Sequence, residues 1–151
     1  GLNKPKAIEP SVARLVKATE ETGRKCGALI LTMVIADETD EAAMAKWEHY
    51  VAGTDVEAIA YRDAQARDDP SQDKYSMPNR RSIEGTDKLP TNQGVLCGSY
   101  ESVARMLDEM AEVPGVEGVM LTFDDFVIGR EQFGTRILPL MRCREKVQAL
   151  A

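Results

Sequence analysis

The cluster at residues 122–126 holds the side chains of this chain that are best suited to chemistry. Phe123, Asp124 and Asp125 directly follow an apolar run of strand length, 116–122. Paired carboxylates at the carboxyl end of a parallel strand can do acid–base work or bind a polar substrate. The structural alternative is that an aspartate caps the next helix and the phenylalanines are core residues. We expect at least one aspartate to be a cap, which leaves Phe123 and the other aspartate as candidate substrate-binding residues.

A second candidate lies in segment 68–93, which contains three prolines, Gly85, several aspartates and serines, and few large apolar residues. Loops of this length in compact domains are usually lids, binding loops or linkers. We interpret the segment as a lid-like insertion. Its guanidinium groups, on Arg80 and Arg81, could close over an anionic group, and a solvated basic pair is the alternative.

Two further features carry weaker signals. Ser99 opens a predicted helix whose first N–H groups could bind an anion, although a simple N-cap explains the residue equally well. His49 is the only histidine, and the sequence supplies no partners that would make it a metal ligand or part of a catalytic triad. We therefore predict no metal site and assign no catalytic residue.

Apolar periodicity and capping residues predict the elements that must position these side chains. Helices are expected at 9–22, from Thr39 to Gly53, from Thr54 to about 67, after Ser99, and from Asp124 or Asp125 onward, with Gly134 and Pro139 interrupting the last. Strands are expected at 28–36, 95–97 and 116–122, the first of them buried on both faces. Strands that alternate with helices indicate a parallel sheet, and three are too few for a doubly wound domain. We predict an α/β fold that forms the C-terminal part, about strands 6–8, of a (β/α)8 TIM barrel, with 1–151 as one portion of that domain.

Composition limits the classes of function. The chain has 151 residues and a net charge of −6, which argues against a nucleic-acid or anionic-membrane surface. Its longest apolar run, 28–36, is far shorter than the roughly 20 residues that span a bilayer. The three cysteines are widely spaced, so we expect buried free thiols and a cytoplasmic protein. The opening without methionine suggests a fragment.

Several segments together resemble the bacterial-luciferase-like superfamily of two-component flavin monooxygenases. Within it they are most similar to the pyrimidine monooxygenases of the uracil-degrading Rut pathway. The matching segments are 31–43, 45–50, 98–100, 103–109, 121–126, 133–134 and 139–141.

The resemblance implies a barrel about twice this length or longer, which uses O2 and reduced FMN from a separate flavin reductase to open or oxygenate a pyrimidine ring. It places 123–125 at the end of strand eight and 68–93 in a mobile insertion over the pocket. Flavin contacts in the superfamily lie mostly on the first five strands, so we assign no cofactor-binding residue and expect no FMN binding by this chain alone. Exposed strand edges favour a homo-oligomer. The alternatives are another small substrate, such as a sulfone, an aminopolycarboxylate or a haloaromatic compound, or an inactive truncated interaction domain.

Overall fold

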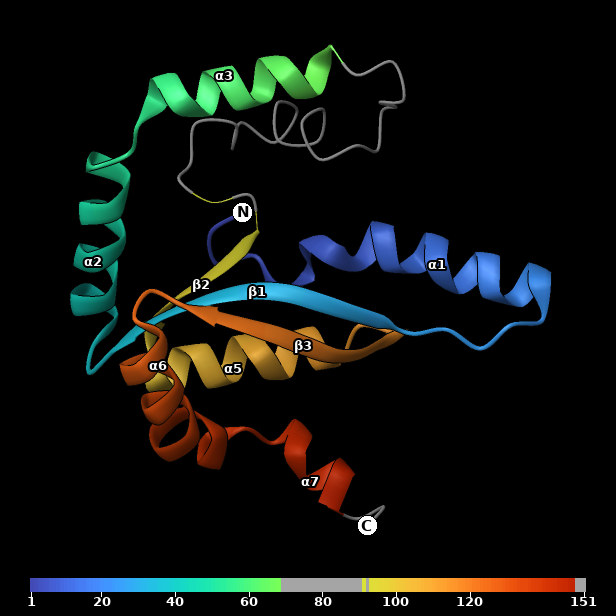
Figure 1. The fold of residues 1–151 in the computed structure, drawn as a ribbon. Helices are drawn as coiled ribbons and strands as arrows, with labels where there is room; N and C mark the ends of the chain where they lie inside the picture. Colours follow the sequence, from blue (N-terminus) through green and yellow to red (C-terminus); the bar gives the residue numbers. More distant parts are fainter. Residues whose placement is uncertain (69–90, 92, 149–151) are drawn as a thin grey trace.

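The computed structural model describes residues 1–68, 91 and 93–148 (Figure 1). Arg80 and Arg81, and most of the predicted lid at 68–93, lie outside the described residues. The helices are η1 (Pro5–Ile8), α1 (Glu9–Thr22), α2 (Asp40–Ala52), α3 (Val56–Arg67), α5 (Tyr100–Ala111), α6 (Phe126–Gln132), η2 (Phe133–Ile137), η3 (Leu138–Leu140) and α7 (Cys143–Gln148). The strands are β1 (Ala28–Asp37), β2 (Gly94–Ser99) and β3 (Val116–Phe123). The element order therefore agrees with the alternation that the sequence predicts.

The described strands form a parallel sheet in the order β2-β1-β3, so β1 is the central strand (Figure 1). Val34 of β1 lies opposite Leu96 of β2 on one side and Phe123 of β3 on the other. Consecutive strands of a closed barrel are neighbours, which would place β3 beside β2. In this structure β3 instead pairs with the edge of β1 that lies opposite β2.

The outer edge of β2 is occupied by the first residues of the chain. The backbone N–H of Val95 donates to the carbonyl of Gly1 at 3.2 Å, and Asn3 N–H donates to the carbonyl of Val95 at 2.8 Å. The Asn3 side chain then pairs with Cys97, donating to its carbonyl at 2.8 Å and accepting from its N–H at 2.7 Å. Because these bonds occupy that edge, β3 can pair only with β1.

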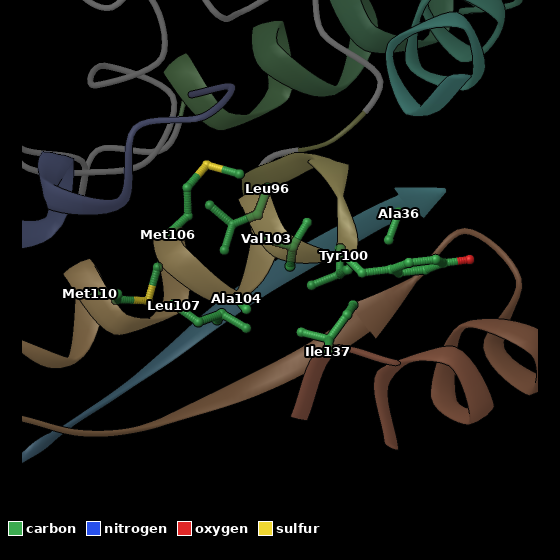
Figure 2. Packing of buried hydrophobic residues seen from close by; sticks show 10 residues of the cluster. Ala36, Leu96, Tyr100, Val103, Ala104, Met106, Leu107, Met110 and Ile137 are labelled. Atoms are coloured by element: carbon green, nitrogen blue, oxygen red, sulfur yellow. The ribbon is translucent and has the colours of Figure 1, made fainter. Parts of the chain in front are cut away.

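Helix α5 covers one face of the sheet. Even-numbered residues of β1, among them Val34 and Ala36, point to this face and meet an apolar stripe of α5 (Figure 2). The other buried members of this core are Leu96, Tyr100, Val103, Ala104, Met106, Leu107, Met110 and Ile137. The periodicity of 103–110 correctly predicts this stripe.

Helix α2 covers the carboxyl end of the opposite face, where Ala43 and Trp47 pack on Ile35, Val95 and Cys97. Both faces of the three-stranded sheet are thus covered only at this end, so the sheet is not that of a complete doubly wound domain. At the amino end the side chains of Leu29, Leu31 and Met120 are 62%, 47% and 53% exposed. The prediction that β1 is buried on both faces is wrong for its first half, because no described helix packs there.

The helix caps follow the sequence with one exception. Thr39 caps α2 by accepting from Ala42 N–H at 3.1 Å. The N-cap of α3 is Asp55, which accepts from Ala58 N–H at 2.9 Å, and not Thr54 as predicted. The Thr54 hydroxyl instead donates to the carbonyl of Tyr50 at 3.0 Å, so it satisfies the end of α2. As predicted, the last helical stretch is interrupted: α6 is followed by a π turn that contains Gly134 and a 3-10 turn that contains Pro139.

None of the helices in the described part of the chain is long and apolar enough to cross a membrane. Its three cysteines are free thiols. Cys97 is buried as expected, Cys143 is half-buried, and Cys26 is exposed, so the expectation of burial is wrong for Cys26.

Helix α7 is anchored by Asp108 of α5, whose side chain is 7% exposed. Its carboxylate accepts from the backbone N–H groups of Cys143 at 2.9 Å and Arg142 at 3.1 Å. Burial acts to raise the pKa of Asp108, but these hydrogen bonds outweigh it and lower the pKa overall. A folded-state pKa below the unfolded one stabilises the fold at neutral pH, and that stabilisation is lost as the pH falls through the folded-state pKa.

The substitution Asp108→Asn should therefore lower the unfolding free energy by about 1–3 kcal/mol at neutral pH, because it weakens acceptance from two buried N–H groups. The loss should shrink in acid, where Asp108 is protonated in both states. Urea unfolding from pH 7 down to a pH below the folded-state pKa of Asp108 measures both effects. Glu109→Gln is the control, since Glu109 pairs with Arg105 at the surface and should contribute less than about 1 kcal/mol. A loss that is independent of pH would contradict this role.

Candidate functional site

A pocket of about 690 Å³ lies between α2, α3 and the carboxyl end of β3. Its apolar wall includes Met33, Trp47, Ala58 and Ile59. Its polar lining includes Tyr50, Gln93 and Asp124. Asp124 is the member of the predicted 123–125 set that the structure brings to this pocket, and such apolar hollows with a few converging polar groups are typical ligand sites.

Tyr50 and Asp124 form a pair at the pocket. The Tyr50 hydroxyl donates to Asp124 Oδ2 at 3.0 Å. Burial, followed by the hydrogen bond and the charge of Asp124, raises the pKa of Tyr50, so the phenol stays protonated at neutral pH. The sequence does not single out Tyr50 as a site residue. A tyrosine at a helix surface position carries no signal that it will meet a residue 74 positions away.

Gln93 is a second residue that the sequence does not single out. Its Nε2 donates to Thr122 Oγ1 at 3.0 Å. Its Oε1 is buried and has no hydrogen-bond partner among the described residues. Buried polar atoms are nearly always paired, so an orphan acceptor at a pocket wall indicates a place for a ligand donor.

A charged pair supports the same end of the sheet. Lys46 of α2 lies 2.8 Å from Asp37 Oδ2 and donates to the carbonyl of Ala36 at 3.0 Å. The hydrogen bond from Lys46 is the main reason that the pKa of Asp37 is lowered. Burial lowers the pKa of Lys46, but the hydrogen bond and charge of Asp37, with a further contribution from Asp124, raise it overall. Both groups are therefore ionised at neutral pH.

Asp125 and Phe123 point away from this pocket. Asp125 is the N-cap of α6 and accepts from the N–H groups of Val127 and Ile128, both at 2.9 Å, which confirms that one aspartate of the pair is a cap. The Phe123 ring packs against Phe126 and Phe133, with centroids 5.8 and 6.1 Å away. It belongs to the α5 side of the sheet, so substrate contact by Phe123 or Asp125 stays a prediction.

The N-terminus of α5 is satisfied from within the protein. Ser99 caps the helix by accepting from Ser102 N–H at 3.2 Å, as predicted. The Asp40 carboxylate accepts from the backbone N–H of Ser99 at 2.6 Å and from the Ser102 hydroxyl at 3.2 Å. These bonds, that of Ser99 N–H first, lower the pKa of Asp40 and keep it charged. An internal carboxylate therefore takes the place that a phosphate would need at this helix.

The remaining reactive side chains offer no separate site. Among the described residues, no group of three or more His, Cys, Asp or Glu side chains could hold a metal ion. His49 lines the rim of the pocket beside the Tyr50 ring. Burial raises the pKa of the Cys97 thiol to about 11, so it is not a nucleophile at neutral pH.

Comparison with solved structures identifies the class of fold. DmoA from Hyphomicrobium sulfonivorans superposes with a TM-score of 0.66 at 21% identity, covering 95% of this chain and 36% of DmoA. That likeness confirms the predicted fold class, an α/β portion of a (β/α)8 barrel. No family model matches the chain.

Curated sequences show a more specific similarity. The chain is 52% identical over 147 residues to the pyrimidine monooxygenase RutA of Klebsiella pneumoniae strain 342, covering 97% of this chain. It is 53% identical over 150 residues to the protein of the same name from Escherichia coli O81, covering 99% of this chain. It spans about two fifths of the length of these relatives, 40% and 39%. The resemblance seen in the sequence is thereby confirmed across nearly the whole chain.

Substitutions of the two neighbouring aspartates should have different effects on the unfolding free energy. Asp125→Ala removes a side-chain cap and should lower the unfolding free energy by about 1 kcal/mol. Asp124→Asn leaves the helix cap intact and should change it by less than about 0.5 kcal/mol, as is usual for a surface polar substitution. Chemical denaturation of both variants provides the comparison. Equal losses would show that Asp124 supports the fold as much as Asp125 does.

Proposed function

We propose that this chain is part of a flavin-dependent monooxygenase that uses reduced FMN and O2 to oxygenate or open a pyrimidine ring. The observation that carries the proposal is the 52–53% identity to pyrimidine monooxygenases over 97–99% of the chain. The match extends over nearly the whole chain and is not confined to a single motif. The chain spans about 40% of such relatives, so the complete active site needs the remainder of a longer protein.

The contribution of this chain is one wall of the substrate pocket. Trp47 and Met33 exclude water from one side, and Tyr50 holds Asp124 at the carboxyl end of β3. We retain Phe123 and Asp125 as further candidates for substrate contact, and Arg80 and Arg81 as lid residues, all from the sequence.

The cofactor is assigned to the rest of the longer protein. When bound, reduced FMN would supply the activation of O2, and a separate flavin reductase would supply the reduced flavin. The described residues do not fit the flavin phosphate at α5, because the Asp40 carboxylate already accepts from the N–H of the N-cap residue Ser99 and from the Ser102 hydroxyl. The free thiols accord with a reducing compartment such as the cytoplasm.

A chimera tests this function. The segment of Klebsiella pneumoniae RutA that aligns with this chain is replaced by residues 1–151, and uracil consumption is measured with reduced FMN and O2. We expect the chimera to bind FMN and consume uracil, whereas the isolated chain should bind no FMN in an absorbance titration. The control is the same chimera with Asp40→Asn. This substitution changes a residue outside the pocket lining, so it shows how a fold defect alone affects uracil consumption.

Each outcome of the chimera experiment has a definite meaning. A folded, FMN-binding chimera that leaves uracil unchanged but oxidises a sulfone, an aminopolycarboxylate or a haloaromatic compound would replace the pyrimidine with that substrate. A folded chimera that acts on none of them would favour an inactive domain. Stoichiometric FMN binding by the isolated chain would contradict the assignment of the flavin site to other residues.

We also propose that the isolated chain self-associates through the uncovered amino end of its sheet, where Leu29, Leu31 and Met120 are exposed. Contiguous exposed apolar surface beside a strand edge favours association. Sedimentation velocity should show a concentration-dependent oligomer that Leu31→Lys converts to a monomer. Val56→Lys, at a residue 62% exposed on α3, is the matched control and should leave the oligomer intact. A monomeric wild-type chain would overturn this proposal.

A further inference from the structure

The polar edge of the pocket formed by Tyr50, Gln93 and Asp124 offers hydrogen-bond acceptors. Tyr50 donates its hydroxyl proton to Asp124, and the Gln93 amide donates to Thr122. What remains is Gln93 Oε1, which has no partner among the described residues, and the lone pairs of the Asp124 carboxylate, which can only accept. A ligand group that pairs with these two acceptors must therefore be a hydrogen-bond donor.

The orphan oxygen of Gln93 is the most informative of these groups. A buried acceptor without a donor destabilises the protein, and a ligand N–H that reached it would remove that cost. Gln93 itself is half-buried and lines the pocket. The last torsion of a glutamine side chain is soft, so the amide can rotate to present Oε1 to a ligand, and the hydrogen bond to the ligand then offsets any weakening of the bond to Thr122.

The rest of the wall defines the shape and charge of the ligand. Met33, Trp47 and Ile59 offer apolar surface that suits the face of a flat ring. Lys46 is paired with Asp37, so it leaves Asp124 as the charged acceptor at the polar edge. The result is an apolar wall with a hydrogen-bond-accepting edge.

We propose that this pocket binds a small planar ring whose edge carries amide or imide N–H groups, and that Gln93 and Asp124 recognise those N–H groups. Tyr50 acts as a positioning residue that holds the Asp124 carboxylate. The inference rests on the proposed function, because a pyrimidine such as uracil presents such an edge. It adds that Gln93 and Asp124 of this chain recognise that edge by accepting hydrogen bonds from its N–H groups.

A pair of probes tests the inference on the 151-residue chain without flavin or oxygen chemistry. Uracil has two ring N–H groups, and 1,3-dimethyluracil keeps the ring and both carbonyls but has none. Trp47 is the only tryptophan and lines the pocket, so its fluorescence reports binding directly. We expect saturable quenching by uracil and at least about tenfold weaker binding of 1,3-dimethyluracil, the loss expected for hydrogen bonds to otherwise unpaired acceptors.

Variants then show which residues produce the preference for uracil over 1,3-dimethyluracil. Gln93→Met keeps the length of the side chain and removes the acceptor, so it should reduce the preference for uracil about five- to tenfold while 1,3-dimethyluracil binds as before. Tyr50→Phe should also reduce the preference, because it releases the Asp124 carboxylate. Tyr61→Phe is the matched control: Tyr61 lies on α3 with a 68% exposed side chain, and the preference should not change.

The outcomes separate this inference from the proposed function. Equal binding of the two probes, binding of neither, or an unchanged preference in a folded Gln93→Met variant would overturn the recognition of N–H groups by this wall. If that variant does not fold, the inference is tested by the ratio of the affinities of the wild-type chain for uracil and 1,3-dimethyluracil alone. An inactive chimera would overturn the monooxygenase proposal and leave the binding ratio standing.

Discussion

The pairing of Asn3 with Cys97 determines the arrangement of the sheet. A side-chain amide that both donates to and accepts from one residue imitates a neighbouring strand, and with the backbone bonds of Val95 it satisfies the outer edge of β2. Unpaired backbone groups at a sheet edge are costly when buried, and Val95 and Cys97 are both buried. The third strand is thereby directed to the free edge of β1, and its carboxyl end arrives opposite α2. The meeting of Asp124 with Tyr50 depends on that placement.

Charge at the carboxyl ends of the strands is balanced locally. Each strand ends near a carboxylate, from Asp37, Asp40 or Asp124, and each carboxylate has a partner of its own: Lys46, the N-terminus of α5, and Tyr50. The first two partners carry positive charge or partial positive charge and compensate the carboxylate. Tyr50 is neutral and gives a single hydrogen bond. Asp124 is therefore the carboxylate whose charge remains available to a ligand.

The sequence predicted local structure well because local rules govern it. The periodicity of 9–22 and 103–110, the caps at Thr39 and Ser99, and the interruption at Gly134 and Pro139 depend on neighbours within one or two helical turns. The order of the strands could not be read in the same way, because it depends on Asn3 and Cys97, which are 94 positions apart. The shift of the cap from Thr54 to Asp55 depends on a competing bond to the end of α2. Tyr50 and Gln93 were missed as pocket residues for the same reason, since only the fold brings them to Asp124.

The two aspartates after β3 show how the end of a strand can serve structure and site together. Both residues lie in the bend between Phe123, the last residue of β3, and α6, and their side chains have different partners. Asp125 is placed to receive the first free N–H groups of α6 and fixes where that helix begins. Its neighbour is thereby turned toward α2, where the hydroxyl of Tyr50 meets it. An acidic pair at this junction thus lets one residue anchor the helix and presents the other to the pocket, where Tyr50 binds it and Lys46 acts on its charge only at longer range.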